Sequence, residues 1–317
     1  MNPIQLRNTS LKRIRNFFNN MCIEEVMSPV MVKSGAIEPF IDSIELEDGY
    51  FLPTSPEISL KKIFAMQVKP FKGIYEISHA FRNDLTGKYH LREFTMVEWY
   101  RNDCNYVELI DDVLNIMTAL VNDTNQNIIN DFRNYKVISI ADLFQNLLKV
   151  KPDASWGYDE YYSLAISKNF IKSQPEPKSQ PAKIYSLTEI FTVIYDYLIT
   201  EFGKTYPGIF FIKEYPYFLR GMAKLSTDGW AMRVEAYYKN LELCSGYQEI
   251  DNADELVKIW ETNNEIRVFA GKNIHPIDLN LIHLSEKMRG VSGMALGLER
   301  TLMALFDIAD IREFKLA

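Results

Sequence analysis

The chain has 317 residues, 47% of them hydrophobic, so it can bury the core of one large domain. A net charge of −7 without a basic tract argues against nucleic acid as the principal partner, although local basic patches stay possible. Because the chain lacks both a signal peptide and a run of 18 apolar residues, we expect a cytoplasmic protein without a membrane span. Three widely spaced cysteines, Cys22, Cys104 and Cys244, predict buried free thiols rather than disulfides or a zinc site.

The N-terminal segment predicts an amphipathic helix that follows the Thr-Ser pair at 9–10 and ends before Pro29. The segment GYFLPTSPE (49–57) predicts a short strand followed by a helix start. We expect Ser55 to cap that helix and Pro56 to lie in its first turn.

Two strand-like runs, 73–84 and 93–101, flank a loop rich in Gly, Lys and His and predict an antiparallel hairpin. The span from 106 to about 148 is predicted to be helical. The Pro-rich near-repeat KSQPEPKSQPAK (172–183) predicts an exposed loop within a helical and loop insertion around 140–205.

Strand character returns over 230–250, and a helix is predicted from Asp254 to about Phe269. The last segment, GVSGMALGLERTLMALF (290–306), predicts a strand that enters a helix at Leu298. Strands and helices are mixed without a strict βαβ alternation, so we predict a single α+β domain over 1–317, an antiparallel sheet flanked by helices.

The predicted hairpin combines charged and aromatic side chains. Guanidinium groups bind phosphate oxygens, aromatic rings stack on a base, and a loop with Lys88, His90 and Arg92 can cover a polyphosphate, so ATP fits this set. The alternative is an ordinary exposed hairpin with cross-strand ion pairs. Residues that share a strand face are Arg82 with Asp84, and Phe94 with Met96, Glu98 and Tyr100.

Glu235 and Glu242 lie seven apart in two strands joined by a Lys-Asn turn, so a hairpin would bring their carboxylates face to face. Two close carboxylates repel and favour a divalent cation between them, and Mg²⁺ suits oxygen ligands together with nucleotide phosphates. A solvated strand face explains the pair equally well. Glu249 follows in SGYQE, where Gly246 permits a ligand to approach the backbone closely.

The run GVSGMALGLER has glycines at Gly290, Gly293 and Gly297, and Arg300 stands at a helix start, where an anion is favoured. The chain has neither a GxxxxGK[ST] loop nor a GxGxxG after a strand, so nucleotide binding would need another architecture. The histidines lie outside any nucleophile motif, which argues against a Ser-His-Asp or Cys-His hydrolase. We expect structural rather than catalytic roles for His79, His90, His275 and His283.

Three motifs in order resemble those of the class II aminoacyl-tRNA synthetases. MSPVM around Pro29 resembles motif 1, FRND with HLREF resembles motif 2, and GMALGLER resembles motif 3. TSPE, EFTMVEWY and LELCSGYQE resemble the lysine-type subgroup, and the resemblance covers essentially the whole chain. The chain is most similar to the truncated lysyl-tRNA synthetase paralogues that modify elongation factor P. As in those paralogues, the first core helix is expected about ten residues in, without a preceding anticodon-binding domain, and Ala295 replaces the usual glycine of motif 3.

The resemblance implies an ATP-dependent ligase that forms an aminoacyl-adenylate. It implies that Arg82 holds the α-phosphate, Arg300 the γ-phosphate, and that Phe94 stacks on adenine. It also implies that Glu235 and Glu242 bind Mg²⁺. Further ATP contacts are implied for Asn83, Asp84, His90, Leu91, Glu242, Leu243 and Gly297. The amino acid would be surrounded by Ser55, Pro56, Glu57, Glu98, Tyr100, Ser245, Glu249 and Ala295.

The substrate follows in part from charge. Carboxylates at Glu57 and Glu249, with Glu98 nearby, would repel an acidic substrate and pair with an ammonium, so the pocket is expected to prefer a diamino acid. The short side chain at Ser245 leaves room at the backbone end of the substrate, so lysine and (R)-β-lysine both stay open. The departures from the family pattern are Asp84 for Glu, Leu91-Arg92 for Asn-Pro, and Ser245 for Asn.

The expected reaction begins with attack of the amino-acid carboxylate on the α-phosphate, which needs no general base because the carboxylate is already ionised. Transfer to a lysine of elongation factor P follows. The alternatives are transfer to a free amine or to tRNA, the latter disfavoured, and a non-catalytic regulatory paralogue. Motif 1 further implies a homodimer through Pro29 and the first helix.

Overall fold

The computed structural model describes residues 2–67, 71–84, 86–121 and 126–315. Its strands are β1 (Glu24–Glu25), β2 (Ile44–Glu45), β3 (Phe51–Leu52), β4 (Gly73–Phe81), β5 (Glu93–Arg101), β6 (Lys136–Ser139), β7 (Phe210–Tyr215), β8 (Ala231–Tyr238), β9 (Leu241–Gln248) and β10 (Ser292–Gly297). Its α-helices are α1 (Pro3–Asn20), α2 (Glu57–Ala65), α3 (Leu109–Val121), α4 (Gln126–Arg133), α5 (Ile140–Leu148), α6 (Tyr158–Ser167), α7 (Gln180–Thr205), α8 (Ala253–Phe269), α9 (Leu279–Leu284) and α10 (Leu298–Phe306).

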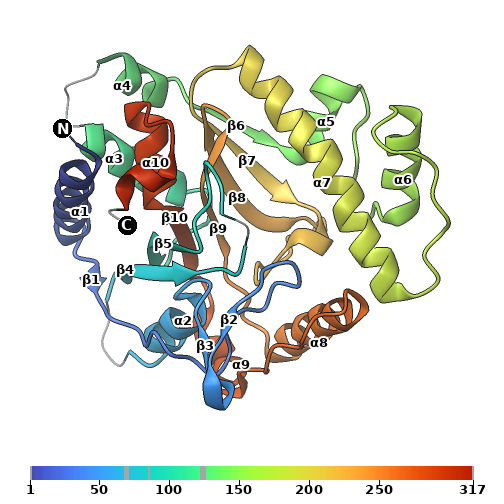
Figure 1. Cartoon of the computed structure of the whole chain (residues 1–317), viewed down its shortest axis with the longest axis horizontal. Coiled ribbons are helices and arrows are strands. Elements are labelled where there is room, and N and C mark those ends of the chain that lie inside the picture. Colours follow the sequence, from blue (N-terminus) through green and yellow to red (C-terminus); the bar gives the residue numbers. More distant parts are fainter. Residues whose placement is uncertain (1, 68–70, 85, 122–125, 316–317) are drawn as a thin grey trace.

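Eight of the strands form one mixed sheet in the order β1-β4-β5-β10-β9-β8-β7-β6, and β2 pairs with β3 in a small second sheet (Figure 1). The β1–β4 and β6–β7 pairs at the two edges are parallel, and all pairs between them are antiparallel. The predicted α+β class with a sheet flanked by helices is therefore confirmed, with two parallel edge pairs that the sequence did not reveal.

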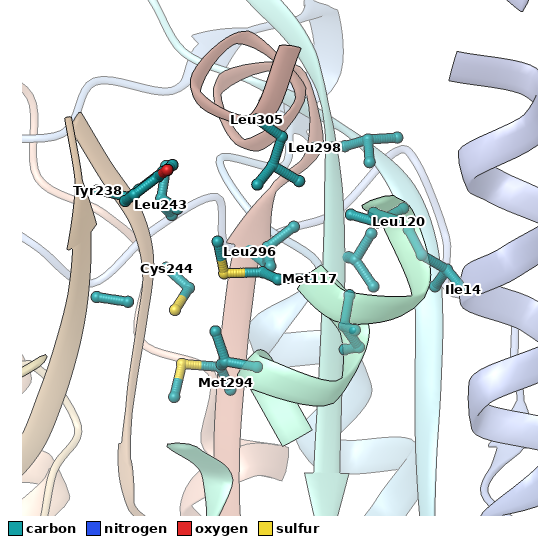
Figure 2. Close-up of a cluster of buried hydrophobic side chains, with 14 of the residues drawn as sticks. Ile14, Met117, Leu120, Tyr238, Leu243, Cys244, Met294, Leu296, Leu298 and Leu305 are labelled. Carbon is teal, nitrogen blue, oxygen red and sulfur yellow. The ribbon is translucent and has the colours of Figure 1, made fainter. Parts of the chain in front are cut away.

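One face of the sheet is packed against α1, α3, α4 and α10. Figure 2 shows Met294 and Leu296 of β10 in this core, with Cys244 of β9 on one side and Met117 of α3 on the other. Leu296 and Met117 are fully buried, so this face carries the main hydrophobic stabilisation.

The opposite face is covered only at its two ends. Helices α5, α6 and α7 pack over β7 and β8, and α2 packs over the β4–β5 end. Figure 1 shows these two groups of helices well apart from each other. Between them β5 presents Glu98 and β9 presents Ser245 to a cavity, which Glu249, the residue directly after β9, also lines.

The first helix begins earlier than predicted, at Pro3 rather than after Ser10. Asn2 is its N-cap and accepts a hydrogen bond from the Gln5 backbone N–H at 2.8 Å, and proline suits the first turn. Thr9 lies inside the helix and donates to the Gln5 carbonyl oxygen at 2.9 Å. Thr9 therefore fits a helix interior, because its hydroxyl finds a partner one turn back.

The prediction of continuous helix from 106 to 148 is wrong. The short strand β6 lies within that span and pairs with β7, for example Val137 opposite Phe211, a partner too distant in sequence to be visible locally. Residues 122–125 of the span lie outside the described residues. The predicted loop 172–183 also ends early, since Ser179 caps α7 and Pro181 lies in its first turn.

The other predicted elements are confirmed: the 73–101 hairpin, the β8–β9 pair, α8, and the β10–α10 junction at Leu298. The predicted cap of α2 is wrong by one residue: the N-cap is Pro56 rather than Ser55, although Ser55 Oγ accepts from the Glu57 backbone N–H at 3.4 Å. All three cysteines are free thiols, but Cys22 is exposed, which corrects the prediction that all are buried.

Within the described ranges, the helices are all too short or too polar to span a bilayer.

Candidate active site

A β-bulge in β9 shapes the floor of the site. The β8–β9 turn has Lys239 and Asn240 at φ 52° and 61°, and the pairing then shifts by one residue. As a result Leu243 and Cys244, although adjacent, both belong to the hydrophobic core, while Glu242 lies with the cavity side chains.

The bulge corrects the predicted pairing of the two carboxylates. Glu235 lies opposite Ser245, and Glu242 lies opposite Tyr237, so Glu235 and Glu242 are diagonal neighbours on one face rather than directly opposite. Diagonal neighbours on a strand pair remain within electrostatic reach of each other.

A cavity of about 260 Å³ lies over β5, β10 and β9 and brings most of the predicted amino-acid residues together. Gly293 is required in its wall, because a Cβ there would lie 2.4 Å from the Tyr100 ring and 2.9 Å from Glu249 Oε1. The cavity also has Glu38 in its wall, which the sequence did not single out. Predicted residues that line it are Ser55, Glu57, Arg82, Glu98, Tyr100, Glu242, Ser245, Glu249 and Ala295.

Lys61 is the main functional residue that sequence reasoning missed. It is only 2% exposed, and its Nζ lies 2.8 Å from Glu57 Oε1 and 2.7 Å from Glu249 Oε2. Burial alone would lower the pKa of Lys61, but Glu249 and then Glu57 outweigh it and raise the pKa. The spacing of Glu57 and Lys61, four apart on a helix, is the sequence pattern from which this pair was predictable.

The carboxylates of this cavity outnumber the lysine that pairs with them. Glu98 Oε2 and Glu249 Oε1 are buried and accept no hydrogen bond within the described residues, although Tyr100 OH donates to Glu98 Oε1 at 2.6 Å. Burial raises the pKa of Glu249 to about 8, and burial followed by repulsion from Glu57 raises the pKa of Glu98. Oxygens left without a donor in this way suit a ligand that brings its own ammonium groups.

The cavity meets a smaller one at Arg82, and we call the two together the groove. The end formed by the smaller cavity is basic. Arg82 lines both the first cavity and a smaller one formed with Arg300 and Phe94, and its guanidinium lies 5.2 Å from the centre of the Phe94 ring. In the described chain neither arginine forms an ion pair; burial, and then repulsion from Arg300, lowers the pKa of Arg82. At Arg82 the hairpin departs from the alternative of exposed paired charges, although His79 and Glu93 do pair across its strands at 2.9 Å. The other predicted residues in the smaller cavity are Asp84, His90, Leu91 and Gly297.

The two candidate metal ligands differ in what they already bind. Glu242 lines the cavity and makes no hydrogen bond or ion pair within the described chain, and burial and then Glu235 raise its pKa. Glu235, by contrast, accepts from Tyr215 OH and Tyr237 OH at 2.6 Å and from Arg233 at 2.6 Å. Glu242 therefore fits a cation ligand, while Glu235 is saturated and fits a supporting role behind it. No group of three or more metal-type side chains occurs in the described ranges.

Some predicted residues lie beside the groove rather than in it. Pro56 lies in the chain next to the cavity residues Ser55 and Glu57 without lining the cavity itself. Asn83 turns toward the hairpin loop and accepts from Arg92 Nη2 at 2.5 Å. Leu243 is buried, but its carbonyl oxygen would lie 3.9 Å from a Cβ at Gly297, so it can contribute only its backbone.

Comparison with known proteins gives one family. A family model described as tRNA synthetases class II (D, K and N) matches residues 1–316. Curated relatives include the elongation factor P--(R)-beta-lysine ligases of Yersinia pestis (strain Pestoides F) and Yersinia pseudotuberculosis serotype O:1b (strain IP 31758). Each is 29% identical over 306 residues, covering 92% of this chain and 87% of the relative.

Proposed function

Since the chain belongs to the class II tRNA synthetase family (D, K and N) and is an ATP-dependent ligase, we propose that it activates lysine or (R)-β-lysine and transfers it to a lysine side chain of elongation factor P. The observation that carries this proposal is the groove with unpaired carboxylates at one end and unpaired arginines at the other. A diamino acid and a nucleotide polyphosphate have the complementary charges.

The acidic end orients the amino acid. The ammonium groups of the amino acid contact Glu98 and Glu249, whose free oxygens are buried. Glu57 adds a third carboxylate. Lys61 bridges Glu57 and Glu249 through its two ion pairs. The substrate carboxylate then extends toward Arg82, which lines both cavities.

Adenylate formation follows by attack of that carboxylate on the α-phosphate, with pyrophosphate leaving. Arg82 and Arg300 neutralise the charge that develops on the phosphates, and Phe94 offers a face for adenine. A Mg²⁺ ion at Glu242 would add further neutralisation of the phosphates. The other ATP contacts proposed beside these groups are Asn83, Asp84, His90, Leu91, the Leu243 backbone and Gly297.

We also propose a homodimer through Pro29 and α1. It is supported by a run of exposed apolar side chains beside Pro29: Met27 is 88% exposed, Val30 52% and Met31 56%. Apolar side chains gathered at one exposed segment are typical of a protein interface. Sedimentation velocity measures the assembly state directly.

Two assays test the proposed activity. Pyrophosphate exchange into ATP is expected with lysine or (R)-β-lysine but not with aspartate or asparagine, because buried carboxylates repel an acidic side chain and leave a neutral amide unpaired. Labelled amino acid is then expected to appear on elongation factor P. Charging of tRNA in its place would overturn the acceptor, and absence of exchange with every amino acid would favour a non-catalytic paralogue.

A further inference from the structure

A second cavity, of about 250 Å³, adjoins the amino-acid pocket. Its walls are mainly apolar and come from α7, α8, the turn η2 (Tyr217–Leu219) and residues 39–41. It shares four wall residues with the first cavity, so the two spaces meet at a common boundary. The shared residues are Glu38, Ile41, Gly221 and Arg233.

Glu38 is the free charge at this boundary. The two arginines of the second cavity are already paired, Arg220 with Glu255 at 2.5 Å and Arg233 with Glu235 at 2.6 Å. Within the described ranges Glu38 has no ion pair. Gly221 lies beside it, since a Cβ there would be in ordinary contact with Glu38 Oε1 at 3.9 Å.

The proposed reaction needs a second amine, that of the acceptor lysine. The contacts proposed for the amino acid leave Glu38 without a role. Glu57, Glu98 and Glu249 already surround the amino acid and Glu242 fits a cation, so Glu38 is a fifth carboxylate, and it lines the apolar cavity as well. A lysine side chain has four methylene groups and one ammonium, which match an apolar wall that ends at a carboxylate.

We propose that this second cavity receives the side chain of the acceptor lysine and that Glu38 binds its ammonium and removes a proton from it. The inference rests on the proposed function. An ammonium has no lone pair, so the acceptor must lose one proton before it reacts. Burial, and then repulsion from Glu57, raises the pKa of Glu38, which suits a proton acceptor at neutral pH.

The step balances without any further reactant. The ammonium gives one proton to Glu38, and the lone pair so freed forms a C–N bond to the adenylate carbonyl carbon. The bond from that carbon to the phosphate oxygen breaks, and AMP leaves with the electron pair. The amide nitrogen loses its second surplus proton to solvent, and Glu38 releases its own proton to solvent before the next turnover.

The test separates activation from transfer. In Glu38→Gln, exchange of pyrophosphate with lysine-like amino acids is expected to fall far less than transfer, although Glu38 also lines the amino-acid cavity. Transfer from the preformed enzyme-bound adenylate to elongation factor P is expected to slow by about 100-fold, the lower range for loss of a proton acceptor. Raising the pH should restore part of the transfer rate, because more of the acceptor amine is then already neutral.

Two further measurements keep the test specific. Hydroxylamine is uncharged at neutral pH, so it should react with the adenylate of Glu38→Gln as fast as with that of wild type. Filling the second cavity by Thr262→Trp should block transfer to the protein acceptor and leave exchange intact. Glu45→Gln, an exposed carboxylate on the same segment, is the matched control and should change neither reaction.

The outcomes distinguish this inference from the function on which it rests. Equal transfer by wild type, Glu38→Gln and Thr262→Trp would overturn the acceptor site and leave the proposed ligase untouched. A loss of exchange as large as the loss of transfer in Glu38→Gln would show that Glu38 serves the amino acid rather than the acceptor lysine, and would overturn the inference. Absence of exchange in the wild type would overturn the proposed function itself.

Discussion

Buried charges in the groove differ from the buried charge of Glu235, which lies next to the groove among Tyr215 and Tyr237. Glu235 has hydrogen bonds from two phenols and an ion pair with Arg233, so its charge is fully used by the fold. Glu98 and Glu249 keep unpaired oxygens, and Arg82 has no carboxylate partner in the described chain. Burying an unpaired charge costs stability, so such groups persist where a ligand completes them. The comparison thus separates structural from ligand-binding residues on one sheet face.

The basic end should show the largest effect. Arg300→Ala is expected to lower the rate of pyrophosphate exchange by about 100- to 1000-fold, because it removes a group that stabilises charge developing on the phosphates. Arg300→Lys should recover only part of this, since an ammonium does not bind phosphate oxygens bidentately. Exchange kinetics measure both. Arg133→Ala, an exposed arginine of α4, is the control, and an equal loss in it would refute the assignment.

Lys61 tests how the acidic end is held together. Lys61→Met is expected to destabilise the fold by about 3–5 kcal/mol, because it leaves Glu57 and Glu249 buried without their cation. Urea unfolding measures this change. Adding Glu249→Gln should return part of the lost stability, whereas Lys12→Met, at an exposed position of α1, should cost little. If Lys61→Met unfolds at the wild-type urea concentration, the buried ion pairs do not support the pocket.

The smallest expected effect is a pH dependence confined to the acidic end. Burial raises the pKa of Glu249 to about 8, so in the free protein this group is protonated below that pH and must lose its proton to bind an ammonium. Affinity for lysine should therefore rise from pH 6 to 8, by at most about tenfold per unit for one proton, and then level off. Calorimetry in two buffers measures both the affinity and the proton release. Glu249→Gln should flatten the profile, and ATP affinity should not follow it.

Local patterns predicted the elements whose partners are close in sequence. The alternation in 73–101 and the Lys-Asn turn after β8 fixed two hairpins, and with the β10–α10 junction they carry most of the predicted site. Strand β6 was missed because its partner β7 is far along the chain, and periodicity cannot report such a pairing. Charge patterns likewise identified Glu57 and Glu249. The sequence did not single out Glu38, because its location between two cavities depends on the tertiary structure.

The position of Lys61 shows a different reason for failure. A lysine in a helix is usually solvated, and only tertiary packing reveals that this one is buried between two carboxylates. The resemblance to the synthetase family supplied roles for individual residues that charge and spacing alone left open. The saturation of Glu235 lay beyond both, because it depends on tyrosines contributed by β7 and β8.

The bulge in β9 gives a criterion for comparing related enzymes. Because Leu243 and Cys244 both turn into the core, Glu242 and Ser245 reach the groove although they are three residues apart. In a regular strand that odd spacing would send them to opposite faces. A homologue can therefore change the apolar residues between them, but losing or gaining one residue there would move its carboxylate from the groove into the core. Spacing, more than identity, is what a sequence comparison should score at this point of the fold.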